Sequence, residues 1–150
     1  HTLAAFGQLG WEPTYRMARL APGKATAHGV LGGKRVFCLP GGPPANELTF
    51  LLLALPALQR MAGGSPHPLP TVYVTLTAEL SPTPGWTRIH QLQLAPRRPG
   101  WTGTSVRPLG RMHGPAKADA LVLHDSDEPM AAGSVVEALL LSNPESPQEE

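Results

Sequence analysis

Two turns rich in proline and glycine, followed by one long apolar segment, constrain this chain more than any other feature of its sequence. Residues 21–25 read Ala-Pro-Gly-Lys-Ala, and residues 39–44 read Leu-Pro-Gly-Gly-Pro-Pro. Glycine lets the backbone approach a ligand closely, proline stiffens a turn, and the first N–H groups of a helix attract anions. The pattern therefore predicts a phosphate or oxyanion site where the two turns meet. The residues expected there are Gly23, Lys24, Gly41, Gly42 and Pro43.

The apolar segment after the second turn predicts a helix from Pro43 to about Met61. Its apolar positions recur at steps of three and four residues, so most of its faces should be buried. Pro56 lacks the N–H that would bond the carbonyl of Leu52, and a kink is expected there. The residues of this stripe are Leu48, Leu51, Leu52, Leu55, Leu58 and Met61.

The region before this helix predicts one short helix and three strands. The helix covers Thr2 to Leu9, and the first strand covers Pro13 to Leu20. Residues 28–31 and 34–39 flank Gly32-Gly33, a pair that permits the positive φ angles of a two-residue hairpin. These elements form an unfinished α/β layer, so residues 1–62 read as the end of a larger α/β domain.

A change of composition at residues 63–70, Gly-Gly-Ser-Pro-His-Pro-Leu-Pro, predicts a linker and a domain boundary. Short strands separated by Pro/Gly turns follow, which is typical of a small all-β barrel or sandwich over residues 71–142. Residues 143–150 are acidic and read as a flexible tail. The predicted strands cover residues 71–80, 88–94, 104–109, 120–124 and 135–141.

Charge and cysteine content narrow the class of protein. The 12 basic and 11 acidic residues leave a net charge of +1, which gives no basic surface for nucleic acid. The single cysteine, Cys38, excludes an intramolecular disulfide, fits a reducing compartment and is expected in the core. The start of the sequence lacks a signal-peptide pattern, and the apolar run 48–58 is too short for a bilayer. We therefore expect a cytoplasmic protein without a membrane partner.

Other residues give weaker indications of chemistry. The six histidines show no zinc-ligand spacing, and no catalytic triad order is present. The acidic group Asp125, Asp127 and Glu128 reads as a solvated turn rather than a metal site. Trp86 and Trp101 fit core packing or turn anchoring, with stacking on a pterin or base ring as the alternative.

In the order and spacing of these elements, the sequence resembles the molybdopterin molybdotransferase family (MoeA and gephyrin E-domain). The family carries a Pro-Gly-Lys turn, a Leu-Pro-Gly-Asn-Pro-Val-Ser segment, and a helix ending near Pro-x-Leu and Ala-Gly. The resemblance spans residues 3–141. The matching segments here are Pro22-Gly23-Lys24, Gly32-Gly33-Lys34, 36–41, Pro43, Pro56-Ala57-Leu58, Ala62-Gly63, Gly85, 118–120 and 132–135.

The resemblance implies a role in molybdenum cofactor biosynthesis. The family inserts molybdate into adenylylated molybdopterin with release of AMP, uses magnesium and acts as a homodimer. Residues 1–62 would be the C-terminal part of a molybdopterin-binding, MogA-like domain, and residues 71–142 the family's small β domain. The magnesium ion would be bound by portions outside this chain, so the isolated chain is expected to be inactive. Lys24 would contact molybdate or phosphate, and the catalytic residues stay unknown.

The sequence also departs from the family pattern at the anion site. Gly42 replaces an asparagine, and Trp86 and Gln91 stand where two arginines are usual. Each lost charge-assisted hydrogen bond is worth roughly 1.5–3 kcal/mol. Three alternatives stay open: a non-catalytic pterin- or nucleotide-binding or scaffolding paralogue, an enzyme with relocated cations, and a structural domain without a ligand. Further departures are Ala21, Pro44, Ala45 and the absence of a clear Gly-Ser pair near Leu109 or Gly110, and the candidate relocated cations are Arg19, Arg88, Arg107 and Arg111.

Overall fold

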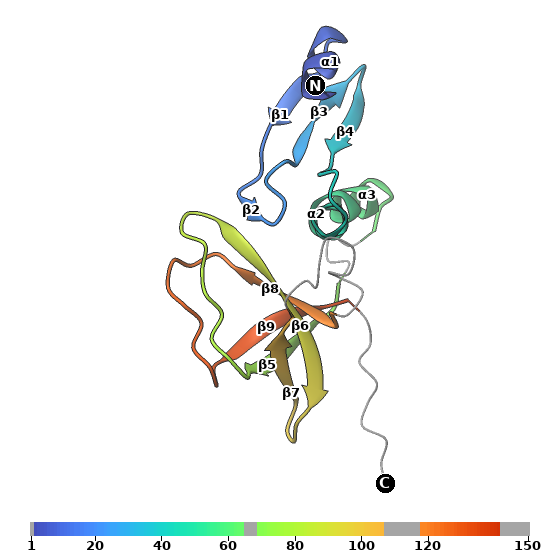
Figure 1. The fold of residues 1–150 in the computed structure, drawn as a ribbon. Helices are drawn as coiled ribbons and strands as arrows, with labels where there is room; N and C mark the ends of the chain where they lie inside the picture. Colours follow the sequence, from blue (N-terminus) through green and yellow to red (C-terminus); the bar gives the residue numbers. More distant parts are fainter. Residues whose placement is uncertain (1, 65–68, 107–117, 142–150) are drawn as a thin grey trace.

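The fold combines a small mixed α/β region with a five-stranded barrel (Figure 1). The structure is a computed structural model, and it describes residues 2–64, 69–106 and 118–141. The α/β and barrel architecture agrees with the expected class. The predicted division at residues 63–70 stays a prediction, and the predicted tail 143–150 lies outside the described residues.

A short helix and a three-stranded antiparallel sheet form the N-terminal region. Helix α1 (Thr2–Gln8) precedes β1 (Glu12–Tyr15), β3 (Ala27–Leu31) and β4 (Lys34–Cys38), which lie in the order β1-β3-β4. Gly32 and Gly33 connect β3 to β4 with φ angles of 55° and 76°, which confirms the predicted hairpin. Cys38 is half-buried at the end of β4, so its expected place in the core is wrong.

The predicted strand from Pro13 to Leu20 is wrong in its second half. Strand β1 ends at Tyr15, and Leu20–Ala21 forms a separate short strand, β2. Strand β2 pairs in parallel with Thr87 and Arg88 of β6, in the barrel sheet. The segment predicted as one strand therefore supplies strands to two different sheets. Between Tyr15 and Leu20 the chain crosses from the first sheet to the second.

The helix predicted for residues 43–61 is present in three consecutive parts. They are α2 (Pro43–Thr49), the π-helical η1 (Phe50–Ala54) and α3 (Leu55–Met61). The N–H of Leu55 bonds the carbonyl of Phe50, five residues earlier. The helix thus adjusts in the turn before Pro56, where we expected a kink, by widening to π-helical hydrogen bonding.

Five strands close into the C-terminal barrel. They are β5 (Thr71–Leu76), β6 (Thr87–Pro96), β7 (Trp101–Ser105), β8 (Ala120–His124) and β9 (Val135–Leu140). They follow the order β6-β7-β5-β9-β8, and pairing of β6 with β8 completes the ring. The strand predicted at 104–109 begins earlier, at Trp101, and residues 107–109 lie outside the described part of the chain.

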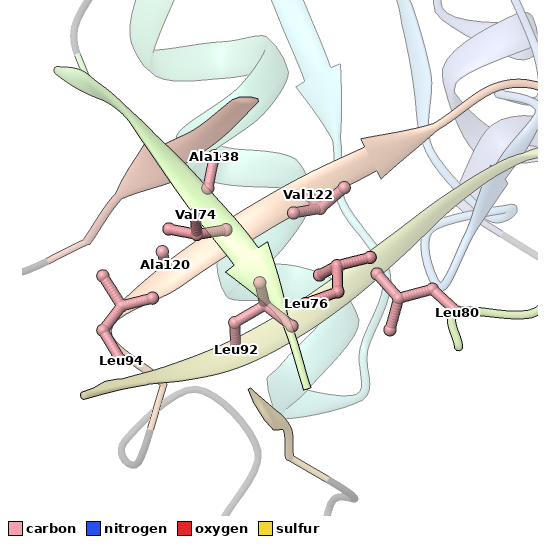
Figure 2. Packing of buried hydrophobic residues seen from close by; sticks show 8 residues of the cluster. All are labelled: Val74, Leu76, Leu80, Leu92, Leu94, Ala120, Val122 and Ala138. Atoms are coloured by element: carbon pink, nitrogen blue, oxygen red, sulfur yellow. The ribbon is translucent and has the colours of Figure 1, made fainter. Parts of the chain in front are cut away.

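Two hydrophobic clusters organise the C-terminal half. The first fills the barrel and draws on alternate residues of facing strands (Figure 2). The second joins Leu48 of α2 to Ile89 and Leu121 on the outer surface of β6 and β8, with Leu20 and Leu52 packed against it. The helix thereby holds the barrel next to β2 and its turn. The barrel cluster contains Val74, Leu76, Leu80, Leu92, Leu94, Ala120, Val122 and Ala138.

The helical segment is less buried than its composition predicts. Leu48 and Ala54 are buried, whereas Phe50, Leu58 and Met61 expose 39%, 45% and 54% of their surface. The apolar stripe therefore packs against the barrel on one side, and its other side is open in the described chain. In the three described ranges, no helix combines the length and the apolar character needed to cross a bilayer.

Candidate anion-binding cavity

A cavity of about 750 Å³ lies beside the middle of β6. Strand β2 pairs with β6 at Thr87 and Arg88, and β7 pairs with it from Leu92 onward. Residues 89–91 lie between these two pairings, and all three line the cavity. Its wall is completed by Ala21, Pro22, Pro44, Arg88, residues 78–81, Thr83 and residues 104–106.

The first predicted turn packs directly against the helix. Gly23 is buried with a φ of 131°, and a Cβ atom built on it would lie 2.7 Å from Cγ2 of Thr49. The hydroxyl of Thr26 donates to the Gly23 carbonyl at 2.7 Å and fixes the turn from within. Only glycine fits both this backbone conformation and this approach. The turn reaches the cavity through Ala21 and Pro22.

The Lys24 side chain takes a different direction from the one expected. Its Nζ lies 5.5 Å from the centre of the Trp86 ring, and the side chain is exposed. An ammonium over an indole face is attracted by the negative face of the ring. Neither Lys24 nor Trp86 lines the cavity, whereas Pro22 forms part of its wall. For Trp86 this geometry favours turn anchoring in the present conformation.

The second predicted turn has a helix start that is poor in hydrogen-bond donors. Gly42 is the N-cap of α2, and no side chain caps the helix there. Pro43 and Pro44 lack N–H groups, and the N–H of Asn46 already bonds the carbonyl of Gly42 at 2.9 Å. Among the first three residues of α2, Ala45 is the one with a backbone N–H group that could donate to a ligand. The expectation that this helix start supplies several anion-binding donors is therefore wrong, because two of its first three residues are prolines.

Arg88 places a positive charge in the cavity wall. It lies on β6 opposite His124 of β8, and its Nη1 lies 3.3 Å from the hydroxyl of Thr83, to which it donates. Both side chains line the cavity. Because the hydrogen bond to Thr83 uses one N–H group of the guanidinium, its other N–H groups remain as donors for a ligand. Among the other cations proposed from sequence, Arg19 offers its backbone carbonyl to Thr87, and Arg107 and Arg111 lie outside the described residues.

Two histidines that sequence reasoning missed lie next to Arg88 in the barrel. His90 and His124 are 7% and 0% exposed, and Nε2 of His90 lies 3.3 Å from Nδ1 of His124. They continue the inward-facing rows of Leu92 on β6 and Val122 on β8. The available signal was one histidine in each of two predicted strands, residues 88–94 and 120–124. The pairing of those strands is what brings the rings together.

The environment of His90 disfavours its charged form. Burial, then the charge of Arg88, then that of His124, lowers the pKa of His90 from 6.5 to about 4. His90 is therefore neutral at physiological pH. A neutral imidazole has one donor nitrogen and one acceptor nitrogen, so His90 offers an acceptor where Arg88 offers donors.

Gln91 occupies a position where the family resemblance led us to expect an arginine. Its side chain is 6% exposed, and its Oε1 is buried without a hydrogen-bond partner among the described residues. An unpaired buried amide oxygen costs about 1–3 kcal/mol. Glu79 also lines the cavity and brings a negative charge to its wall.

The remaining candidates have structural roles in the described residues. Asp127 accepts a hydrogen bond from the backbone of Gly85 at 2.9 Å, as expected for a turn. Trp101 packs against the barrel core. Within residues 2–64, 69–106 and 118–141, no three His, Cys, Asp or Glu side chains lie close enough together to hold a metal ion. Of the anion-binding residues expected from the sequence, Arg88 lines the cavity, whereas Gly23, Lys24, Gly41, Gly42 and Pro43 do not.

Comparison with solved structures shows which proteins share this architecture. A molybdopterin biosynthesis MoeA protein from Pyrococcus horikoshii superposes with a TM-score of 0.79 and 24% identity over 95% of this chain. A molybdenum cofactor biosynthesis protein from Pyrococcus furiosus gives 0.74 and 18% over 87%. A second MoeA structure from Pyrococcus horikoshii OT3 gives 0.70 and 19% over 85%. The chain therefore has the fold of part of these MoeA proteins, in agreement with the resemblance drawn from its sequence.

The chain covers less than half of the length of each of these three structures. The chain spans 35%, 46% and 32% of the length of the three structures, which is consistent with a C-terminal portion. No family model matches the sequence, and no curated protein matches it.

Proposed function

We propose that this chain is the C-terminal part of a molybdopterin molybdotransferase-like protein of molybdenum cofactor biosynthesis. In this proposal, the protein binds adenylylated molybdopterin and transfers molybdate to it. The observation that carries the proposal is the cavity where the Pro22 turn, the Pro44 helix start and Arg88 converge. Its volume, about 750 Å³, is within the range of small-molecule sites.

The site supports binding of an anionic substrate through Arg88. The guanidinium lies in the cavity wall and supplies charge-assisted hydrogen bonds, which are roughly twice as strong as neutral ones. Lys24 joins the site if a ligand draws its ammonium away from Trp86, and Gly23, Gly41, Gly42 and Pro43 shape the two turns. Molybdate is a substrate in this scheme. Magnesium would be bound by portions outside this chain, and a homodimer in the cytoplasm is part of the same proposal.

The test uses the full-length protein, because the chain is shorter than its structural neighbours. We expect molybdate-dependent loss of adenylylated molybdopterin with release of AMP, followed by chromatography of both compounds. The Arg88→Ala variant should lower kcat/KM by about tenfold or more if a charge-assisted contact is lost. Arg97→Ala, at the tip between β6 and β7 outside this cavity, is the matched control and should retain activity. Absence of turnover in the wild-type protein would refute the proposed reaction.

A second candidate function is a non-catalytic pterin- or nucleotide-binding or scaffolding protein. Two observations favour it over efficient metal insertion: the prolines remove donors from the start of α2, and Gln91 stands where an arginine is usual. This candidate requires pterin or nucleotide affinity that is the same with and without molybdate. Measurement of binding by calorimetry in both conditions, beside the turnover assay, separates the two functions.

A further inference from the structure

One negative and one positive side chain lie in the wall of the cavity, and the same connecting segment is in contact with both. Glu79 and Arg88 each line the cavity. Thr83, four residues after Glu79 in the segment between β5 and β6, accepts the hydrogen bond from Nη1 of Arg88 at 3.3 Å. The two charges offset each other. A ligand that suits this wall therefore needs hydrogen-bond donors for the carboxylate as well as an anionic group for the guanidinium.

The backbone of Glu79 is fixed on both sides. Thr77 donates from its N–H and from its hydroxyl to the carbonyl of Gly103, at 3.0 and 3.2 Å. Leu80 is 2% exposed and exchanges two backbone hydrogen bonds with Met130, at 2.9 and 3.1 Å. Glu79 itself is exposed, and in the described part of the chain no ion pair or hydrogen bond engages its carboxylate. The wall thus offers a ligand two acceptor oxygens from a fixed point of the backbone.

The two ring systems of the proposed substrate differ in what they offer a carboxylate. An ionised carboxylate only accepts hydrogen bonds, and its two oxygens are matched best by two parallel N–H groups. A pterin ring has such a pair, because its 2-amino group lies next to the N–H of ring atom N3. Adenine has one amino group flanked by ring nitrogens that are acceptors. An adenine edge would therefore place a lone pair against one of the carboxylate oxygens.

We propose that this cavity binds the pterin end of the substrate, with Glu79 accepting hydrogen bonds from the 2-amino and N3–H groups and Arg88 binding the neighbouring phosphate. The inference rests on the proposed function, from which it takes a substrate that contains a pterin. It adds which end of that substrate lies in the cavity and which residue selects it. Glu79 has a role in specificity here, and the transfer of molybdate is not assigned to it.

The other lining residues fit a flat ring with one anionic substituent. Pro22, Pro44 and Ile89 supply apolar surface for the faces of a ring, and about 750 Å³ accommodates a drug-sized molecule. The pKa of His90 is lowered to about 4, chiefly by burial, so this histidine adds no second positive charge at neutral pH. Arg88 is then the one cationic side chain among the described lining residues. One guanidinium suits one phosphate group beside the ring.

The test compares pterin-6-carboxylate with lumazine-6-carboxylate on the full-length protein, by calorimetry at pH 6 without divalent cations. Both probes have the same bicyclic ring and the same carboxylate for Arg88, but lumazine has a carbonyl in place of the 2-amino group. That carbonyl would face the carboxylate of Glu79, acceptor against acceptor. We expect the pterin probe to bind about tenfold or more tightly than the lumazine probe.

Three variants test the assignment of residues. Glu79→Gln replaces one acceptor oxygen by a donor, so the preference for the pterin probe should fall to about twofold or less. Glu47→Gln removes the same charge from an exposed site on α2 outside the cavity, and it should keep the preference. Arg88→Ala should weaken both probes by a similar factor and leave their ratio unchanged. The comparison of ratios cancels any general effect of charge on anion binding.

Each outcome decides the matter. Equal binding of the two probes, or a preference that Glu79→Gln leaves unchanged, would overturn the inference while leaving an anion site at Arg88. A preference that appears only with added magnesium would also overturn it, because Glu79 would then hold a cation. Failure of both probes to bind would overturn it together with the proposed location of the substrate. A preference that depends on Glu79 in a protein without turnover would uphold the inference and refute the proposed reaction.

Discussion

Gly23 and Thr49 lie so close that a Cβ atom on the glycine would come within 2.7 Å of the threonine methyl group. This contact brings together two segments separated by the whole β3–β4 hairpin. The turn that contains Lys24 therefore packs against the helix that begins at Pro43. The two turns singled out in the sequence are thereby joined through the side of the helix, and Pro22 and Pro44 meet in one cavity.

Gly23→Ala should destabilise the protein strongly. The substitution forces a φ of 131° on an alanine and drives a methyl group into Thr49 and into Leu20, whose Cβ lies 3.0 Å away. Backbone strain and overpacking together predict a loss of about 2–4 kcal/mol in the free energy of unfolding, measured by urea denaturation. Gly41→Ala is the control, because nothing lies within 4 Å of its Cβ position and its φ is not positive. An equal effect of both variants would contradict the proposed contact.

The contact of Lys24 with Trp86 should have a small, measurable coupling energy. A cation over an aromatic ring at an exposed site contributes about 0.5–1 kcal/mol. A double-mutant cycle with Lys24→Met and Trp86→Leu, followed by denaturation, should give a coupling in this range that high salt reduces. Lys34→Met, an exposed lysine at the start of β4, should show no coupling to Trp86. A zero coupling for Lys24 would mean that its ammonium does not rest on the ring in solution.

The sequence allowed most elements to be predicted, because their patterns are local. The hairpin at Gly32-Gly33 and the strands β5, β8 and β9 follow from residues close together in the chain. The cavity depends on which strands become neighbours, and local patterns do not contain that information. His90 and His124 therefore looked like isolated histidines, and β2 looked like the continuation of β1.

Some features of the site could have been predicted from the residues alone. Pro43 and Pro44 remove two N–H groups from the helix start, and this follows from their chemistry without coordinates. The direction of Lys24, by contrast, depends on Trp86, which lies sixty-two residues later and is brought near by the pairing of β2 with β6. Positions near a turn can thus be inferred from sequence, but side-chain contacts between distant strands require the fold.

Stability should decrease as the pH falls from about 6.5 to 4. The pKa of His90 is lowered to about 4 by burial, Arg88 and His124, against 6.5 in the unfolded chain. Above pH 6.5 His90 is neutral in both states and has no effect. Between the two values the unfolded chain binds a proton that the folded chain does not, so protonation favours unfolding, by up to about 3 kcal/mol near pH 4.

Urea denaturation across this pH range, compared with His90→Gln, isolates the contribution of His90. The variant should show a flatter dependence, because it has no titratable group at this position. His28, whose pKa is lowered by burial and then by Arg35, acts with the same sign in the other sheet and is unchanged in the variant. Parallel curves for the wild-type protein and His90→Gln would show that His90 titrates normally in the folded state.

The barrel core should depend on Leu92 more than on any exposed leucine of the neighbouring strand. Leu92 is 0% exposed, faces the interior and contacts the region of Gly103, where a Cβ atom would lie 2.8 Å from its Cδ1. Leu92→Ala should cost about 2–5 kcal/mol in the free energy of unfolding, because it removes buried apolar area and leaves a void in the barrel. Leu123→Ala on β8 is the matched control, since Leu123 is 41% exposed on the outer face, and its cost should be under about 1 kcal/mol. Similar losses for the two leucines, measured by the same denaturation, would contradict the inward orientation of this row of β6 and with it the placement of His90 inside the barrel.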